Sequence, residues 1–139
     1  MKAKHRLKFL LLSVMLVSCN ASQALKETSE NERLQSRFEE FKKEGWDVNS
    51  DLLWGYFFKD PDEEKLRPLS KHLEAANYRL VDVAHFDGDK DERAGYVLHV
   101  EKVETHSAIS LAKRNQEFRD LAAKFAVESY DGWDVGKVK

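Results

Sequence analysis

Residues 78–103, YRLVDVAHFDGDKDERAGYVLHVEKV, decide the fold, because they predict two strands joined by a polar turn. The strands are Tyr78–Phe86 and Ala94–Val103, and the turn Asp87–Asp91 consists of aspartates, a glycine and a lysine. In the second strand, alternate residues are apolar, as expected for a strand with one buried face. The stretch therefore predicts a β-hairpin.

A helix precedes the hairpin, and a strand precedes that helix. Asp60-Pro61-Asp62-Glu63 predicts the helix start, with Asp60 as the cap and the proline in the first turn. Pro68 is expected to kink this helix or to mark its true start, and Asn77 to end it in a left-handed conformation. Before it, Leu52–Phe58 is an apolar, aromatic-rich run typical of a buried strand.

A helix and then a strand are also expected after the hairpin. Ser107 is a candidate cap for a helix that continues to about Phe125, and Ser129–Val135 predicts a final short strand. The combined order is β-α-β-β-α-β, so we expect an α+β, ferredoxin-like fold. It has a four-stranded antiparallel sheet with two helices on one face. An additional N-terminal helix is expected from Ser29 to Gly45.

The N-terminus has the pattern of an export signal. Four basic residues and no acidic ones accompany the apolar run Phe9–Val17, which is about half the ~20 residues that cross a bilayer as a helix. At the end of this apolar run stands Leu16-Val17-Ser18-Cys19. This sequence resembles the lipobox of bacterial lipoproteins, whose cysteine is lipidated and becomes the new N-terminus. We therefore expect a signal peptide at residues 1–18, a lipidated tether at 19–28 beginning with Cys19, and one domain at 29–139.

This interpretation predicts a location in the bacterial cell envelope. Two or three acyl chains hold a protein stably on a membrane. By analogy with enterobacterial sorting, Asn20 after the cysteine favours the outer membrane, with the domain facing the periplasm.

Charge and cysteine content exclude several classes of function. Residues 1–18 hold four of the 23 basic groups and none of the 25 acidic groups, so the remainder carries a net charge of −6. An acidic domain gains little from phosphate attraction, so no nucleic-acid partner is expected. The only cysteine is Cys19, which excludes an internal disulfide. No cofactor is expected.

The C-terminal third of the chain resembles a known family. Leu121-Ala122-Ala123-Lys124-Phe125 and then Tyr130-Asp131-Gly132-Trp133 are similar to the last helix and strand of the RraB family, the regulators of ribonuclease activity B. A weaker resemblance extends back to Phe38. It implies a ferredoxin-like fold and a non-catalytic role, which in the family's namesake is to bind ribonuclease E in the cytoplasm. An exported protein cannot meet ribonuclease E. The resemblance therefore supports the family's fold for this chain more strongly than it supports the family's binding partner.

The expected function is accordingly that of a membrane-anchored regulatory lipoprotein that binds an unknown protein, with an unknown oligomeric state. One alternative is an immunity-type lipoprotein that neutralises a toxin. Another is a cytoplasmic regulator of ribonuclease E, if export does not occur. A third is a small hydrolase or metal binder that uses His85 and His99.

Few residues are candidates for a site. Tyr130, Asp131 and Trp133 form a possible partner-binding edge, although a purely structural role is favoured. The loop at Asp87 fails as an EF-hand, because its sixth and twelfth positions are Glu92 and Leu98. No spacing of histidines and cysteine matches a zinc site, so no metal is expected.

Overall fold

The computed structural model describes the backbone of residues 9–139 and the side chains of residues 20–139. The predicted signal peptide and the Cys19 side chain thus lie outside the described side chains. Seven elements follow in order: α1 (Phe9–Lys43), β1 (Leu52–Asp60), α2 (Glu63–Ala75), β2 (Arg79–Phe86), β3 (Gly95–Glu104), α3 (Ala108–Lys124) and β4 (Ser129–Gly136). After α1 they have the predicted β-α-β-β-α-β order.

The four strands form one antiparallel sheet in the order β2-β3-β1-β4. The predicted hairpin is confirmed: β2 and β3 pair, with Phe86 opposite Gly95 next to the turn. The central strands β1 and β3 pair from Leu52 with Glu104 to Asp60 with Tyr96. The ferredoxin-like α+β class predicted from the sequence is therefore correct.

The core lies between one face of the sheet and the helices. Trp54, Tyr56 and Phe58 are almost completely buried, as are the inward side chains of α2 and α3. Phe118 on α3 contacts the rings of both Tyr56 and Phe58. Because successive strand side chains point to opposite faces, the residues between these aromatic side chains lie on the other face of the sheet.

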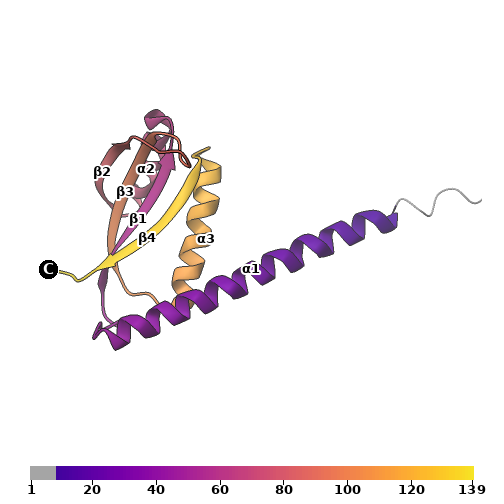
Figure 1. Cartoon of the computed structure of the whole chain (residues 1–139), viewed down its shortest axis with the longest axis horizontal. Helices are drawn as coiled ribbons and strands as arrows, with labels where there is room; N and C mark the ends of the chain where they lie inside the picture. Colours follow the sequence, from indigo (N-terminus) through magenta and orange to yellow (C-terminus); the bar gives the residue numbers. More distant parts are fainter. Residues whose placement is uncertain (1–8) are drawn as a thin grey trace, which may run out of the picture.

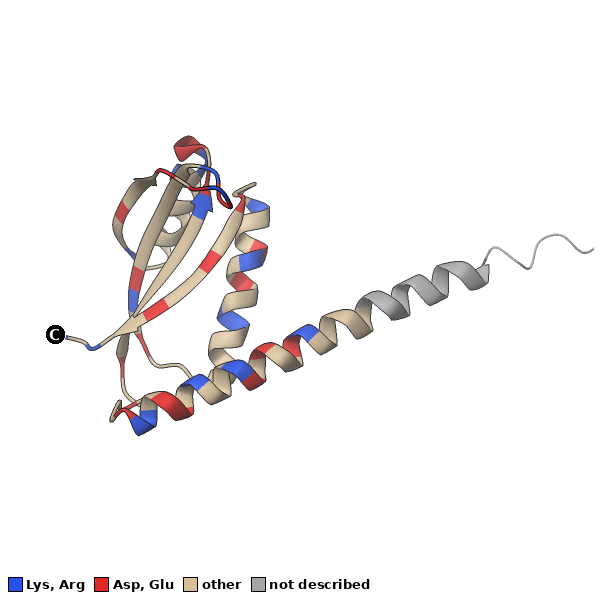
Figure 2. Ribbon diagram, viewed as in Figure 1, with Lys and Arg blue, Asp and Glu red and all other residues tan. Residues whose placement is uncertain are grey.

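Helix α1 consists of a docked part and a projecting part (Figure 1). Leu34, Phe38 and Phe41 are buried, and Phe38 stacks on Trp54 with the ring centroids 6.1 Å apart. The Glu30 carboxylate accepts hydrogen bonds from Asn115 and Arg119 of α3. In contrast, every residue from position 20 to 29 is exposed. Acidic and basic residues follow one another along the docked part of the helix, whereas residues 20–29 carry only Lys26 and Glu27 (Figure 2).

The predicted start of α1 at Ser29 is wrong. The helix passes through Ser29, whose hydroxyl donates to the Lys26 carbonyl instead of capping a first turn. The segment expected to be a tether, residues 20–28, is therefore exposed helix. Among the described residues, no helix is long and apolar enough to cross a membrane.

The start of α2 also differs from the prediction. Asp62, not Asp60, is the cap, and its carboxylate accepts from the Glu64 N–H. Asp60 ends β1 and is 2% exposed; its two oxygens accept the N–H groups of Asp62 and Glu128. Pro68 lies inside the helix and does not mark its start, so helix formation continues through it.

Other local predictions are confirmed. Asn77 adopts the left-handed conformation after α2, with φ of 66°. Ser107 caps α3, since its hydroxyl accepts from the Ser110 N–H and the Ser110 hydroxyl accepts from the Ser107 N–H.

Candidate functional site

The predicted partner-binding residues on β4 do not share one surface. The Tyr130 ring packs against Phe58 and Phe118, and its hydroxyl donates to Asn115 Oδ1 at 2.8 Å. Burial raises the pKa of Tyr130 well above the usual value for a tyrosine. Trp133 is half-buried and lies against Trp54, with 5.4 Å between ring centroids. Both aromatic side chains therefore pack against the core.

Asp131 and Gly132 differ from their aromatic neighbours. The pairing of β1 with β4 shifts here, because Phe57 lies opposite Gly132 and Phe58 lies opposite Tyr130. Asp131 is the extra residue of a β-bulge, and its carboxylate pairs with Lys59 at 3.2 Å. Gly132 has a φ of 111°, which a residue with a side chain rarely adopts. Of the three candidates, Asp131 is thus the one whose side chain is exposed, while Tyr130 and Trp133 are half-buried.

A buried polar network connects the end of β3 with α3. Glu104 Oε1 accepts from the Tyr56 hydroxyl and from Arg114 Nη1, each at 2.7 Å. His106 Nε2 lies 3.0 Å from the Tyr56 hydroxyl. The Arg114 guanidinium also donates to the Tyr78 hydroxyl. Each member thus has a polar partner, as a buried polar group requires.

The electrostatics of this network do not suit proton transfer near neutral pH. Burial opposes ionisation of Glu104, but hydrogen bonds from His106, Tyr56 and Arg114 outweigh it and lower the pKa of this carboxyl to about 2. Burial raises the pKa of Tyr78 to about 12 and that of Tyr56 still further. An acid–base catalyst works best with a pKa near the operating pH. Near neutral pH, Glu104 is therefore ionised while Tyr56 and Tyr78 are neutral, and their hydrogen bonds hold β1, β3 and α3 together.

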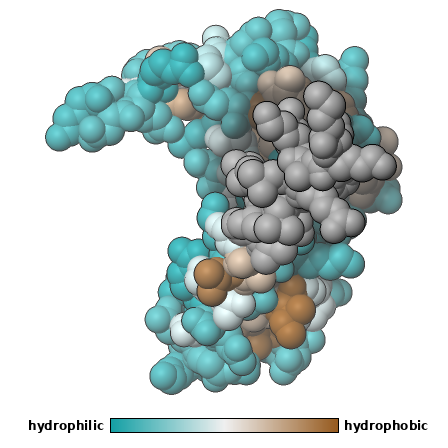
Figure 3. Space-filling model, turned by 90° about the vertical axis from the view of Figure 1, so that its right-hand side faces the viewer, coloured by the Kyte–Doolittle hydropathy of each residue, from teal (hydrophilic) through white to brown (hydrophobic). Residues whose placement is uncertain are grey.

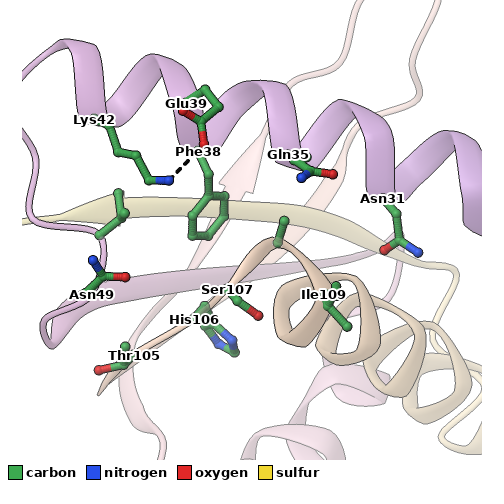
Figure 4. Close-up of a pocket in the computed structure, with 12 residues that line it drawn as sticks. Asn31, Gln35, Phe38, Glu39, Lys42, Asn49, Thr105, His106, Ser107 and Ile109 are labelled. Carbon is green, nitrogen blue, oxygen red and sulfur yellow. Dashed lines mark hydrogen bonds and ion pairs between the residues drawn. The ribbon is translucent and has the colours of Figure 1, made fainter.

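A groove of about 350 Å³ lies between α1 and the start of α3 (Figure 4). Asn31 and Phe38 point into it from α1, opposite His106 and Ile109. Asn31 Oδ1 is buried and has no hydrogen-bond partner among the described residues. The charges that line the groove balance, because Glu39 and Lys42 pair at 2.8 Å. The groove therefore offers space but no electrostatic preference for a ligand.

The structure keeps the two hairpin histidines apart. His85 lies opposite Tyr96, whereas His99 lies opposite Asp82 on β2 and stacks on Phe57. In the part of the chain that the structure describes, no three His, Cys, Asp or Glu side chains form a cluster that could hold a metal ion. The structure thus places no convergent set of ligands at the hairpin.

The face of the molecule in Figure 3 is mostly hydrophilic where the residues are described, with hydrophobic residues gathered in a few patches. Among the large apolar side chains of residues 20–139, Ile109 and Leu25 have the largest exposed fractions, at 74% and 72%. Apolar side chains that are exposed singly are normal on folded domains, so these two do not by themselves define an interface.

Comparison with protein families matches residues 31–135 to RraB, regulator of ribonuclease activity B. This match runs from Asn31 in the docked part of α1 to Val135, the residue before the end of β4. The chain belongs to the RraB family. Its members are regulators and not enzymes, in agreement with the expectation of a non-catalytic protein. A comparison with curated proteins found no match.

Membership of the RraB family accounts for the fold and for the non-catalytic class, but it does not select a binding surface. Two structural groups were not predicted from the sequence: the Glu104 network and the stacked pair Phe57–His99. Glu104 follows the alternating part of β3, so nothing in the pattern separates it from exposed charges. Phe57 lies in a run of aromatic residues, where the side that each ring takes depends on the register of the strand.

Proposed function

We propose that this RraB-family domain acts as a regulator that binds another protein while a lipid on Cys19 holds it to a membrane of the bacterial cell envelope. The match over residues 31–135 supports regulation by protein binding. Leu16-Val17-Ser18-Cys19, after a basic and apolar leader, supports lipidation and export. The outer membrane, with the domain facing the periplasm, is the proposed location.

The single observation that carries this proposal is the separation of the lipobox from the folded domain. Among the described residues, the first side chain of α1 that hydrogen-bonds to α3 is Glu30, and the family match begins at residue 31. Residues 20–29 are exposed helix, which spans about 15 Å at 1.5 Å per residue. This helix supports a function as a spacer, because it separates Cys19 from the domain without contributing to the core.

Replacing the proposed lipid acceptor tests the anchor. We expect Cys19→Ser to abolish labelling by radioactive palmitate and to move the protein from the membrane fraction to the soluble fraction, because no thiol remains to form the thioether. Ser18→Ala is the matched control, since it keeps a small residue before the cysteine and should keep the label. Membrane association and palmitate labelling that persist in Cys19→Ser contradict the proposal.

Family membership also supports a second candidate function. If the chain stays in the cytoplasm, its partner is expected to be the ribonuclease that the family regulates. Crosslinking in cells followed by purification of the full chain separates the two. Recovery of an unprocessed precursor with ribonuclease E supports the second candidate, and recovery of a mature lipoprotein with an envelope protein supports the first. An immunity role predicts that the captured protein is a toxin.

A further inference from the structure

The face of the sheet that lies opposite the helices carries a polar surface with a defined arrangement. Among the described residues no helix covers it, because the inward side chains of α2 and α3 pack with Trp54, Tyr56 and Phe58. The strand register places two rows of residues across this open face. One row is Asp82, His99, Phe57 and Gly132, and the next is Arg79, Glu101, Gly55 and Asp134.

An aromatic pair occupies the centre of the first row. Phe57 and His99 stack across β1 and β3 with their centroids 4.4 Å apart and their planes at 22°. On the far side of Phe57 the next residue is Gly132, and a Cβ built there would meet nothing within 4 Å. The ring of Phe57 is therefore next to open space, bordered by the bulge at Asp131.

Acidic side chains surround this pair. Gly55 has no side chain, and the Asp134 carboxylate and His99 Nε2 lie above it, where a Cβ would come within 2.2 Å and 2.9 Å of them. His99 Nε2 is buried and has no hydrogen-bond partner among the described residues. Glu101 Oε1 is 3.6 Å away from it. Acceptor oxygens and an unpartnered ring nitrogen thus meet above Gly55.

The charges of this surface are unbalanced. Its two cations are already engaged, because Arg79 pairs with Glu101 and Lys59 pairs with both Glu92 and Asp131. Within the described residues, Asp82 and Asp134 make no ion pair and no side-chain hydrogen bond. A surface with free carboxylates beside a half-buried aromatic ring is complementary to a planar cation, which stacks on the accessible part of the ring and donates to the oxygens.

We propose that the open face of the sheet binds a basic segment of the partner protein, with an arginine side chain against Phe57 and paired with Asp134. This inference rests on the proposed function as a protein-binding regulator and adds the surface and the chemistry of the partner. The residues Tyr130-Asp131-Gly132-Trp133 of β4 then have two roles. Its aromatic residues pack against the core, while Asp131 and Gly132 shape the edge of the binding surface.

Binding of a defined peptide to the full chain tests this surface. The probe is a fluorescent peptide that alternates arginine with glycine, compared with a lysine version of equal length, and the readout is anisotropy in non-ionic detergent. We expect tighter binding of the arginine peptide, weaker binding at high salt, and a loss of roughly three- to fivefold in affinity for Asp134→Asn. Phe57→Leu should remove most of the preference for arginine over lysine, because it keeps an apolar side chain but no π-face.

Asp120→Asn is the matched control for charge. It removes the same charge from an exposed position of α3, so it should leave peptide affinity unchanged if the open face is the site. Equal losses for Asp120→Asn and Asp134→Asn would mean general attraction to an acidic protein, and that result overturns the inference. Wild-type affinity in both Asp134→Asn and Phe57→Leu overturns it as well. Thermal unfolding of each variant verifies that the fold is intact.

A failure of the open-face inference can be distinguished from a failure of the proposed function. The peptide assay in detergent does not depend on whether Cys19 carries lipid. A partner that crosslinks equally well to wild type, Asp134→Asn and Phe57→Leu would preserve protein binding as the function and exclude the open face. Loss of membrane association in wild type would contradict the anchor and leave the peptide result valid.

Discussion

Glu104 illustrates how one ionised side chain stabilises this fold. Its side chain is 15% exposed and accepts hydrogen bonds from Tyr56 and Arg114, whose side chain is 19% exposed. Removing one partner of such a buried pair leaves the other charge without compensation, which is costly. The carboxylate therefore holds together the end of β3, the centre of β1 and the first half of α3.

The low pKa of Glu104 makes its contribution depend on pH. The folded value is about 2, against an ordinary value of 4.5. Below pH 4.5 the unfolded chain binds a proton that the folded chain does not, so stability falls as the pH falls from about 4.5 to 2. We expect Glu104→Gln to lower the free energy of unfolding by about 3 kcal/mol at neutral pH, and the difference from wild type to shrink over that range. Urea unfolding of both proteins at a series of pH values measures this difference in the free energy of unfolding. A difference that does not change with pH would contradict the lowered pKa of Glu104 as its cause.

Single residues were predictable from the sequence where a local backbone rule applies. Asn77 after α2 and Ser107 before α3 follow helix-end chemistry that depends only on neighbours in the chain. Asp60 was assigned a local role but makes a distant contact, with the Glu128 N–H 68 positions away. The partners of Glu104 and His99 were likewise unpredictable, because they depend on the register between strands and not on a local pattern.

At the scale of elements, both strands of the hairpin were predicted to within one residue at each end. β3, expected at Ala94–Val103, is Gly95–Glu104. The long N-terminal extension of α1 was missed because burial gave no signal there. Residues 20–29 are exposed and continue the docked helix. Adding residues to an existing helix avoids the cost of forming a first helical turn, so this segment can be helical without burying a face.

The boundary within α1 gives a prediction about stability. Leu34 is 6% exposed in the core, whereas Leu25 is 72% exposed on the projecting part. Leu34→Ala should lower the free energy of unfolding by about 2–4 kcal/mol, because it leaves a cavity in the hydrophobic core. Leu25→Ala is the matched control and should change it by less than about 0.5 kcal/mol. Chemical denaturation of both variants measures these values, and similar losses would mean that the folded unit begins before Glu30.

At the scale of the whole molecule, the helices and the open sheet face have separate functions under our proposals. One side of the sheet and three helices make the core, and the other side carries the acidic surface around Phe57. The exposed part of α1 leaves the domain at Glu30. It therefore increases the distance between Cys19 and the domain without covering either face of the sheet. A regulator held in this way can present its open face to a partner while its anchor stays distant.

Limited proteolysis of membranes tests this arrangement of the intact protein. Lys26 lies in the exposed part of α1, where local opening of the helix costs little, whereas the basic residues of the docked elements are protected by the fold. Brief trypsin treatment should therefore release a folded fragment that begins at Glu27 into the soluble fraction, as mass spectrometry would detect. Lys26→Gln removes the cleavage site and should greatly slow this release. A fragment that begins at Glu27 yet remains on the membrane would place the attachment in the domain and not at Cys19.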